Sequence, residues 1–358
     1  MRYILLLALV MLAPAPTQAP RAPADKPLEI YFIDVEGGQA TLFVTPAGQS
    51  MLIDTGFPGN GDRDLNRILA TMKQAGALRL DYLLVTHYHL DHVGNAAALA
   101  AKVPVGTFVD HGETVEPNSK ELLAPYDAAR KSGKHLLVKP DDKVPIGGMD
   151  VTVVSAGGAH LRKALNGVDS ENTLCGTFRP KETDPSENAQ SVGTVIAFGR
   201  FRMLDLGDLT WNKEHDLVCP DNLIGPVDLY LTTHHGVAQS NAPVIVNAVQ
   251  PRVAIMNNGA KKGGSAEAWQ TVHDSPRLQD FWQLHYAVDA GKDHNAAEQF
   301  IANLDESTAH NIKVTAQRDG SFTVTNDRNG LTKAYKAVTS SQLAVAGCRV
   351  AVMSSRLP

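Results

Sequence analysis

Three histidines and an aspartate lie within the six residues 87–92, which read HYHLDH. They follow directly on an apolar segment, residues 81–86, that is typical of a buried strand. A strand end delivers its side chains to the edge of a sheet, which is where open α/β folds bind their ligands. Three imidazoles and a carboxylate so close together are also the donors of a metal site. The segment therefore predicts a metal centre at the edge of a sheet.

The spacing within this segment is suited to two metal ions. His87 and His89 point the same way while the chain is extended. Asp91 and His92 follow where the chain turns toward a helix, so they face a neighbouring position. Metal ions in two-metal hydrolases lie ~3.5–4 Å apart. Because the donors are nitrogen and oxygen without thiolate, we expect two divalent ions, zinc first, with manganese or iron as alternatives.

The rest of the chain alternates between strand-like and helix-like segments, which favours an α/β layer architecture. Strands are expected at residues 28–35, 40–45, 81–86, 105–109, 150–155, 193–198, 202–206, 227–233 and 252–256. Helices are expected at residues 62–75, 95–102, 242–249 and 265–285. Residues 312–317 and 321–325 flank an Arg-Asp-Gly turn and predict a β-hairpin.

Composition narrows the class of protein. The chain has 358 residues, 43% of them hydrophobic and 20% charged, which is typical of a folded globular protein. The 33 Lys and Arg residues are fewer than the 38 Asp and Glu residues, so the net charge is −5. This balance disfavours nucleic acid as the partner and favours a small-molecule substrate, although basic charge gathered on one face would keep nucleic acid open.

The N-terminal residues predict export. A short positive start precedes an apolar run at residues 4–13, too short to span a bilayer, and Ala24 ends a small-residue cleavage site. We expect a signal peptide at residues 1–24, a periplasmic or extracellular protein, and no membrane span in the mature chain. Of three cysteines, Cys175 and Cys219 form a disulfide in one interpretation, and the odd count leaves at least one thiol unpaired.

These motifs resemble the metallo-β-lactamase superfamily, whose signature His-x-His-x-Asp-His is matched at every fixed position by residues 87–92. Asp54 resembles the family's strand-ending aspartate, Asp208 the aspartate that bridges the metals, and His234 the histidine that completes the second metal's shell. The resemblance implies a four-layer αββα sandwich at residues 25–310, followed by a β-hairpin extension and tail at 311–358. Within the family, the soluble domain of the competence protein ComEC and its secreted relatives are most similar.

The resemblance leaves two ligand assignments open. His234 is favoured over His235, because aligning residues 228–234 on 81–87 puts His234 in the place of His87; His235 then lines the pocket. For the third ligand of the first metal, His160 lies in the interval where the family supplies it, whereas His111 directly follows a strand parallel to that of His87.

What this resemblance implies is a metal-dependent hydrolase. Its metal-activated hydroxide would attack an ester, lactone, amide or phosphodiester bond, with Asp91 accepting or relaying the proton. Two other interpretations stay open: a mononuclear iron oxidoreductase of the same fold that acts on sulfur compounds, and a metal-stabilised binding protein without turnover. Neither the oligomeric state nor the substrate follows from the sequence.

Overall fold

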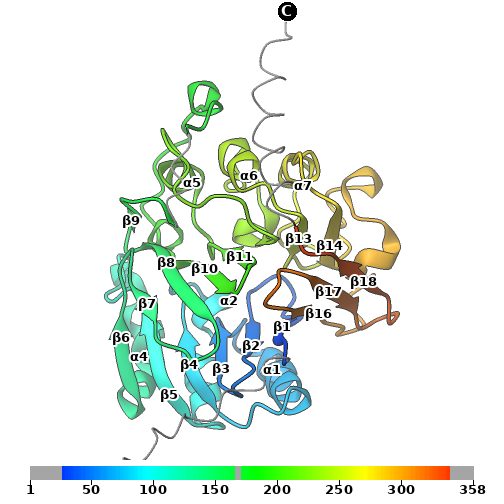
Figure 1. Cartoon of the computed structure of the whole chain (residues 1–358). Coiled ribbons are helices and arrows are strands. Elements are labelled where there is room, and N and C mark those ends of the chain that lie inside the picture. The colour runs from blue at the N-terminus through cyan, green and yellow to red at the C-terminus, as the bar shows by residue number, and fades with distance from the viewer. Residues whose placement is uncertain (1–25, 166–170, 339–358) are drawn as a thin grey trace, which may run out of the picture.

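The computed structural model describes residues 26–165 and 171–338, whose strands form two mixed sheets (Figure 1). The first sheet contains β1 (Leu28–Phe32), β2 (Thr41–Val44), β3 (Ser50–Ile53), β4 (Leu80–Leu84), β5 (Val105–Asp110), β6 (Lys134–Leu137), β16 (Ile312–Ala316), β17 (Phe322–Asn326) and β18 (Thr332–Tyr335). The second contains β7 (Lys143–Val144), β8 (Asp150–Ala156), β9 (Ala159–His160), β10 (Gly193–Phe198), β11 (Phe201–Asp205), β12 (Leu229–Leu231), β13 (Val253–Met256), β14 (Asp280–His285) and β15 (Ile301–Asn303).

The two sheets have a similar topology, because each contains a run of adjacent parallel strands. In the first, the order is β18-β17-β16-β1-β2-β3-β4-β5-β6, and β3 to β6 are parallel. In the second, the order is β15-β14-β13-β12-β11-β10-β8-β7, and β11 to β15 are parallel. Because parallel strands need crossover connections, helices follow most of them.

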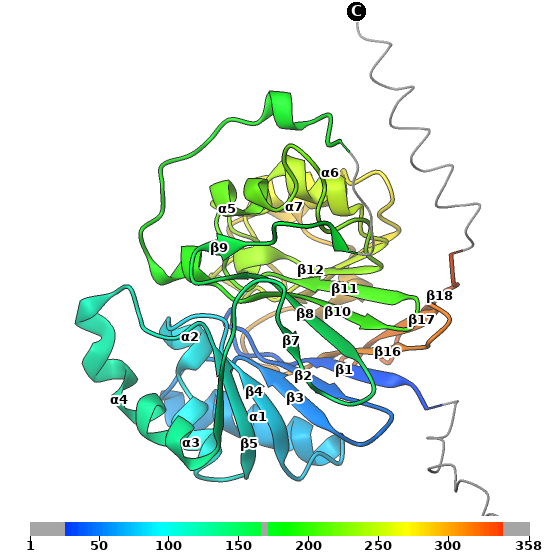
Figure 2. The same ribbon diagram turned by 60° about the vertical axis from the view of Figure 1, so that its left-hand side comes forward.

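Helices cover the outer face of each sheet, which completes four layers (Figure 2). The first sheet is covered by α1 (Arg63–Gln74), α3 (Ala96–Ala100) and α4 (Lys120–Ala129). The second is covered by α5 (Trp211–Asp216), α6 (Pro243–Val249) and α7 (Ala266–His273), and the short α2 (Leu90–Val93) follows β4. The expected αββα sandwich is confirmed.

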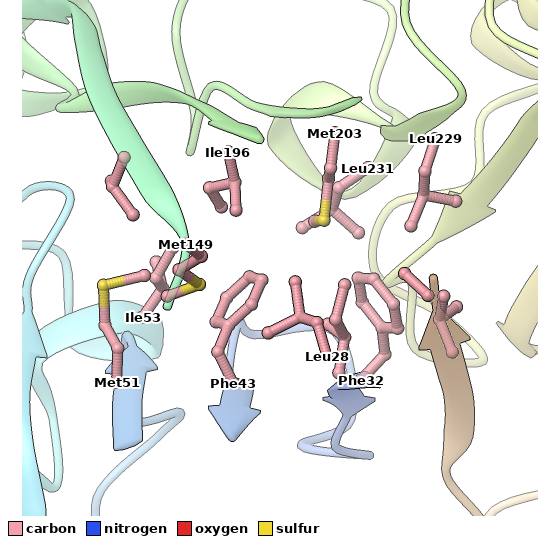
Figure 3. Packing of buried hydrophobic residues seen from close by; sticks show 14 of the residues in the cluster. Leu28, Phe32, Phe43, Met51, Ile53, Met149, Ile196, Met203, Leu229 and Leu231 are labelled. Carbon is pink, nitrogen blue, oxygen red and sulfur yellow. The ribbon is translucent and has the colours of Figure 1, made fainter. Parts of the chain in front are cut away.

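The period-2 alternation of the strands explains this layering. Ile30 and Phe32 of β1 point into the core between the sheets, whereas Tyr31 packs on the helical side with Ile68 of α1. Figure 3 shows the inter-sheet core, in which Phe43 faces side chains of the second sheet. Alternate residues therefore bury both faces of each sheet.

One expected helix is wrong. Residues 265–285 contain α7 only as far as His273, and Asp280–His285 is the strand β14. Pro276 lies between the two elements, where it ends the helical pattern. Along β14, Trp282 faces the inter-sheet core while Phe281 packs on the helical side, which is the alternation of a strand. Phe281 and Trp282 therefore serve as core on the two faces of this strand.

The structure also bears on the expectations for the C-terminal hairpin, the cysteines and membrane spans. The hairpin at residues 312–326 forms, and β16 pairs with β1 in the first sheet. Cys175 and Cys219 form a disulfide. No helix in the described ranges is long and apolar enough to cross a membrane. The signal peptide at 1–24 and Cys348 lie outside the described residues, and the division of the chain at residue 310 stays a prediction.

Candidate metal centre

The candidate site forms where strands of both sheets end side by side. β3 and β4 are parallel neighbours whose ends lead to Asp54 and to the segment 87–92. β11 and β12 are parallel neighbours in the other sheet, and their ends lead to Asp208 and to the turn that contains His234 and His235. The backbone N–H of His234 donates to the carbonyl of Gly207, which ties these last two ends together.

Four buried side chains form the centre of the site. One ligand atom from each of Asp91, His92, Asp208 and His235 lies within 4.8 Å of all the others. Nε2 of His92 and Nε2 of His235 are 3.2 Å apart, and Oδ2 of Asp91 is 3.4 Å from the former and 3.2 Å from the latter. Oδ1 of Asp208 is buried and has no hydrogen-bond partner in the described residues. A buried carboxylate oxygen without a donor in such a cluster fits a cation site.

A second group of donors adjoins this cluster. Nε2 of His87 is 3.1 Å from Nδ1 of His89 and 3.8 Å from Oδ2 of Asp208. The same Oδ2 is 3.3 Å from Nε2 of His234. Asp208 therefore lies between the two groups: its Oδ1 is 3.4 Å from His235, and its Oδ2 also lies 3.2 Å from Nε2 of His92. The bridging role expected for Asp208 stays a prediction.

The His234–His235 turn differs from the simple strand alignment. Both residues have positive φ, 55° and 54°, which is uncommon for non-glycine residues and costs about 1–3 kcal/mol each. The tight turn lets both imidazoles reach Asp208 instead of pointing to opposite faces. The structure thus places His235, which the sequence assigned to the pocket, in the cluster with Asp91 and His92, while His234 lies beside His87.

Asp54 fixes the orientation of a histidine in the cluster through a hydrogen bond. Its Oδ2 accepts hydrogen bonds from Nδ1 of His92 and from Oγ1 of Thr86, both at 2.7 Å. Asp54 is fully buried and has φ of 61°. Because Nδ1 of His92 donates to this carboxylate, its Nε2 is left free to face Asp91 and Asp208. This is the arrangement in which a carboxylate orients a metal-binding histidine.

Glu116 is a residue of the site that the sequence did not reveal. It lies between β5 and α4, where its Oε1 is 3.2 Å from Nε2 of His89 and accepts the N–H of Glu187 at 3.1 Å. It orients His89 as Asp54 orients His92, which leaves Nδ1 of His89 facing His87. No motif surrounds Glu116, so only the folded chain shows this role.

His111 and His160 do not lie among the metal-facing donors. Nε2 of His111 contacts the buried carboxylate of Glu187 at 3.0 Å, and the His111 ring packs on Tyr88 with centroids 4.6 Å apart. His111 thus helps build the wall of the site. His160, in β9, is partly exposed and its Nδ1 lies 4.0 Å from Asp216. Neither histidine is placed to act as the third ligand of the first metal.

Electrostatics favour positive charge at the centre. Burial acts to raise the pKa of Asp208, but the neighbouring His235, His92 and His234 outweigh it and hold that pKa well below its usual range. Burial and the neighbouring His92 lower the pKa of His87 well below its usual value. Burial acts to lower the pKa of His92, but Asp208, Asp91 and Asp54 outweigh it and hold that pKa well above its usual value. The carboxylates of the cluster therefore stabilise a positive charge among them.

A buried cluster of imidazole and carboxylate donors at the strand ends of an αββα sandwich is the arrangement expected of a metallo-hydrolase. Residues 33–162 match the family described as the Metallo-beta-lactamase superfamily. The matched range includes the motif at 87–92.

Curated relatives agree with this assignment. A UPF0173 protein of Pyrococcus abyssi is 27% identical over 237 residues, which are 65% of this chain and 86% of that protein. The competence protein ComA of Neisseria gonorrhoeae is 26% identical over 255 residues, 70% of this chain but only 30% of ComA. A UPF0173 metal-dependent hydrolase of Staphylococcus saprophyticus is 35% identical over 63 residues, 18% of this chain and 24% of that protein.

Proposed function

We propose that the protein is an exported hydrolase that uses two divalent metal ions, zinc first, on either side of Asp208. Nε2 of His92, Nε2 of His235 and Oδ2 of Asp91 would hold the second ion. The observation that carries this proposal is the buried Oδ1 of Asp208, which has no donor although it lies 3.4 Å from His235. A cation satisfies that oxygen and keeps the neighbouring carboxylate charges from repelling each other.

Nε2 of His87, Nδ1 of His89 and Nε2 of His234 would hold the first ion. Oδ2 of Asp208 completes this group, since it lies 3.8 Å from His87 and 3.3 Å from His234. His234 then occupies the place for which the sequence considered His111 and His160. The consecutive histidines of the turn are divided between the two ions, which accounts for their strained backbone.

Divalent ions held by these residues would supply a water molecule of lowered pKa and a Lewis acid for the bond that is cleaved. The side chains of this protein would accept the proton and hold the ligands in orientation. Asp91 contributes Oδ2 to the cluster, and we assign its Oδ1 to accept the proton of the attacking water. Asp54 and Glu116 hold His92 and His89 in orientation, so the donors need no rearrangement during turnover.

The substrate carries an ester, lactone, amide or phosphodiester bond. A phosphodiester stays among these, while the net charge of −5 favours a small molecule over nucleic acid. Export is supported by the Cys175–Cys219 disulfide, because disulfides persist in oxidising compartments. N-terminal sequencing of the protein recovered outside the cytoplasm tests this: it should start at Asp25, and a chain retained in the cytoplasm with Met1 in place would contradict export.

The hydrolase is tested by turnover. Purified protein should cleave at least one of four probes, an ester, a lactone, a β-lactam or a phosphodiester, and a chelator should abolish this until Zn²⁺ or Mn²⁺ is restored. His92→Ala should lose both activity and metal. One iron per chain with oxygen consumption would instead favour the oxidoreductase, and metal binding without turnover of any probe would favour a binding protein.

A further inference from the structure

Lys262 contacts the candidate metal centre from the loop that follows β13. Its Nζ donates to Oδ2 of Asp91 and, at 2.7 Å, to the carbonyl of Gly37. In the described ranges, Lys262–Asp91 is the ion pair that joins a lysine or arginine to one of the carboxylates of the cluster, Asp91 or Asp208. Nζ of Lys262 also lies 5.0 Å from the centre of the Phe57 ring.

The loop that carries Lys262 is fixed from two sides. On one side, Gly37 has φ of +87°, and a Cβ added there would lie 2.8 Å from N of Gly259 and 3.0 Å from Cβ of Lys262. On the other, a Cβ added at Gly263 would lie 2.2 Å from the carbonyl of His235. The N–H of Gly264 donates to that same carbonyl at 2.8 Å. The position of Lys262 is thus tied to the backbone of a predicted metal ligand.

An ammonium group has three donors, of which Gly37 and Asp91 take two. One donor is left, and the side chain of Lys262 is 41% exposed, so this donor can reach a further partner. Metal ions bound beside Asp91 would share its negative charge, which leaves Lys262 with surplus positive charge directed at whatever the ions bind. Neutralising Asp91 is therefore not a sufficient role for this lysine.

We propose that Lys262 binds an anionic oxygen of the substrate next to the bond that is cleaved. This proposal rests on the hydrolase function and restricts it: the substrate carries either a phosphodiester or a carboxylate beside its ester, lactone or amide. Both groups present an oxygen that accepts a charge-assisted hydrogen bond from an ammonium. Lys262 is a specificity-determining residue in this account, while Asp91 and the histidines carry out the reaction.

The neighbouring lysine provides a matched control. Lys261 has the same charge and lies one position earlier in the same loop, but its Nζ pairs with Glu306 at 3.0 Å and its side chain is 68% exposed. Lys261→Gln removes one positive charge from the loop without touching the site. Lys262→Gln removes the charge at the site, and Lys262→Arg restores it.

The first measurement compares two pairs of probes: a phosphodiester with the matching neutral triester, and a carboxylate-bearing ester with its neutral methyl ester. Lys262→Gln should lower kcat/KM for an anionic probe about 10- to 100-fold, chiefly through KM, because one charge-assisted hydrogen bond is lost. The neutral partner should change less than about twofold, as should both probes with Lys261→Gln, and Lys262→Arg should recover part of the loss. The pair that responds identifies the anion. An equal loss on neutral and anionic probes would overturn the proposal, as would no loss.

A second measurement keeps the test separate from the hydrolase proposal. Binding of inorganic phosphate and of acetate to the metal-loaded protein is measured by calorimetry, and metal content is measured for every variant. Lys262→Gln should weaken binding of one anion about tenfold or more at unchanged metal content. If the protein binds these anions through Lys262 but cleaves no probe, the hydrolase is wrong and the anion site stands. If anion binding is the same in Lys262→Gln, the anion site is wrong whatever the turnover.

Discussion

At the scale of single residues, the orienting carboxylates determine how firmly the predicted ligands are held. Asp54→Asn should weaken zinc binding by about 10- to 100-fold, because Nδ1 of His92 loses the carboxylate that fixes its orientation at 2.7 Å. Competition with a fluorescent chelator measures this affinity. Asp110→Asn is the control: Asp110 is equally buried, but its partners are Tyr126, Arg130 and His135. That variant should lose stability and keep its zinc affinity; equal zinc affinity in both variants would contradict the role of Asp54.

The sequence revealed the residues of the metal centre unevenly. Residues 87–92 could be predicted because all their donors lie in one contiguous motif. His235 could not, since the choice between adjacent histidines depends on the two positive φ values of the turn. Glu116 had no signal at all, because its contact with His89 arises from the approach of the loop between β5 and α4. Local sequence patterns do not reveal single donors that only the tertiary structure brings together.

At the scale of elements, the turn between β12 and α6 depends on helix α5. Both carboxylate oxygens of Glu214 accept backbone N–H groups, from Asn241 at 2.9 Å and Ala242 at 2.8 Å. Burial raises the pKa of Glu214 to about 7. Between its ordinary value and about 7, the folded chain binds more protons here than the unfolded chain. This contribution to stability is therefore present at low pH and is lost as pH rises to about 7.

Glu214→Gln removes that pH dependence. The stability of the wild type relative to the variant should fall by roughly 1–3 kcal/mol between about pH 5 and about pH 8. Urea unfolding at the two pH values gives this difference. Glu121→Gln, at an exposed site of α4, should follow the wild type at both. A constant offset between the wild type and Glu214→Gln would show that the carboxyl does not titrate in this range.

The loop after β13 gives a second prediction for an element. Gly263→Ala should lower both zinc affinity and stability, because the added Cβ would collide with the carbonyl and Cβ of His235 at 2.2 and 2.7 Å. Gly48→Ala is the control, since Gly48 also has positive φ, +79°, but has open space around it. The control should cost about 1 kcal/mol with unchanged zinc affinity. Calorimetry with zinc titration measures both; normal zinc binding by Gly263→Ala would contradict the coupling of this loop to the metal centre.

The elements themselves were mostly predictable, with an informative exception. Strands β4, β5, β10 and β13 follow from their apolar runs, and α1 follows from the spacing of Leu65, Ile68 and Met72. β14 was mistaken for helix, because its run of aromatic and apolar residues is buried on both faces and lacks the polar alternation of a half-buried strand. Periodicity does not separate a buried strand from a buried helix, and Pro276 was the local signal against a continuous helix.

At the scale of the whole molecule, the C-terminal strands belong to the first sheet and to its core. β16 pairs with β1 along five residues, and Val324 of β17 is fully buried between the sheets. Val324→Asp should destabilise the protein by about 3 kcal/mol or more, since it buries an unpaired charge. Thr323→Asp, on the opposite face of the same strand, should cost about 0.5 kcal/mol. Similar melting temperatures for the two variants would show that the extension after residue 310 folds independently of the sandwich.

We propose that two metal ions share Asp208 and that the adjacent histidines of one turn are divided between them. Anomalous diffraction from crystals of zinc-loaded protein tests it most directly. We expect two peaks, one bonded to His87, His89 and His234, the other bonded to Asp91, His92 and His235, and both in contact with Asp208. A single peak, or a first ion bound by His111 or His160 in place of His234, would contradict the account.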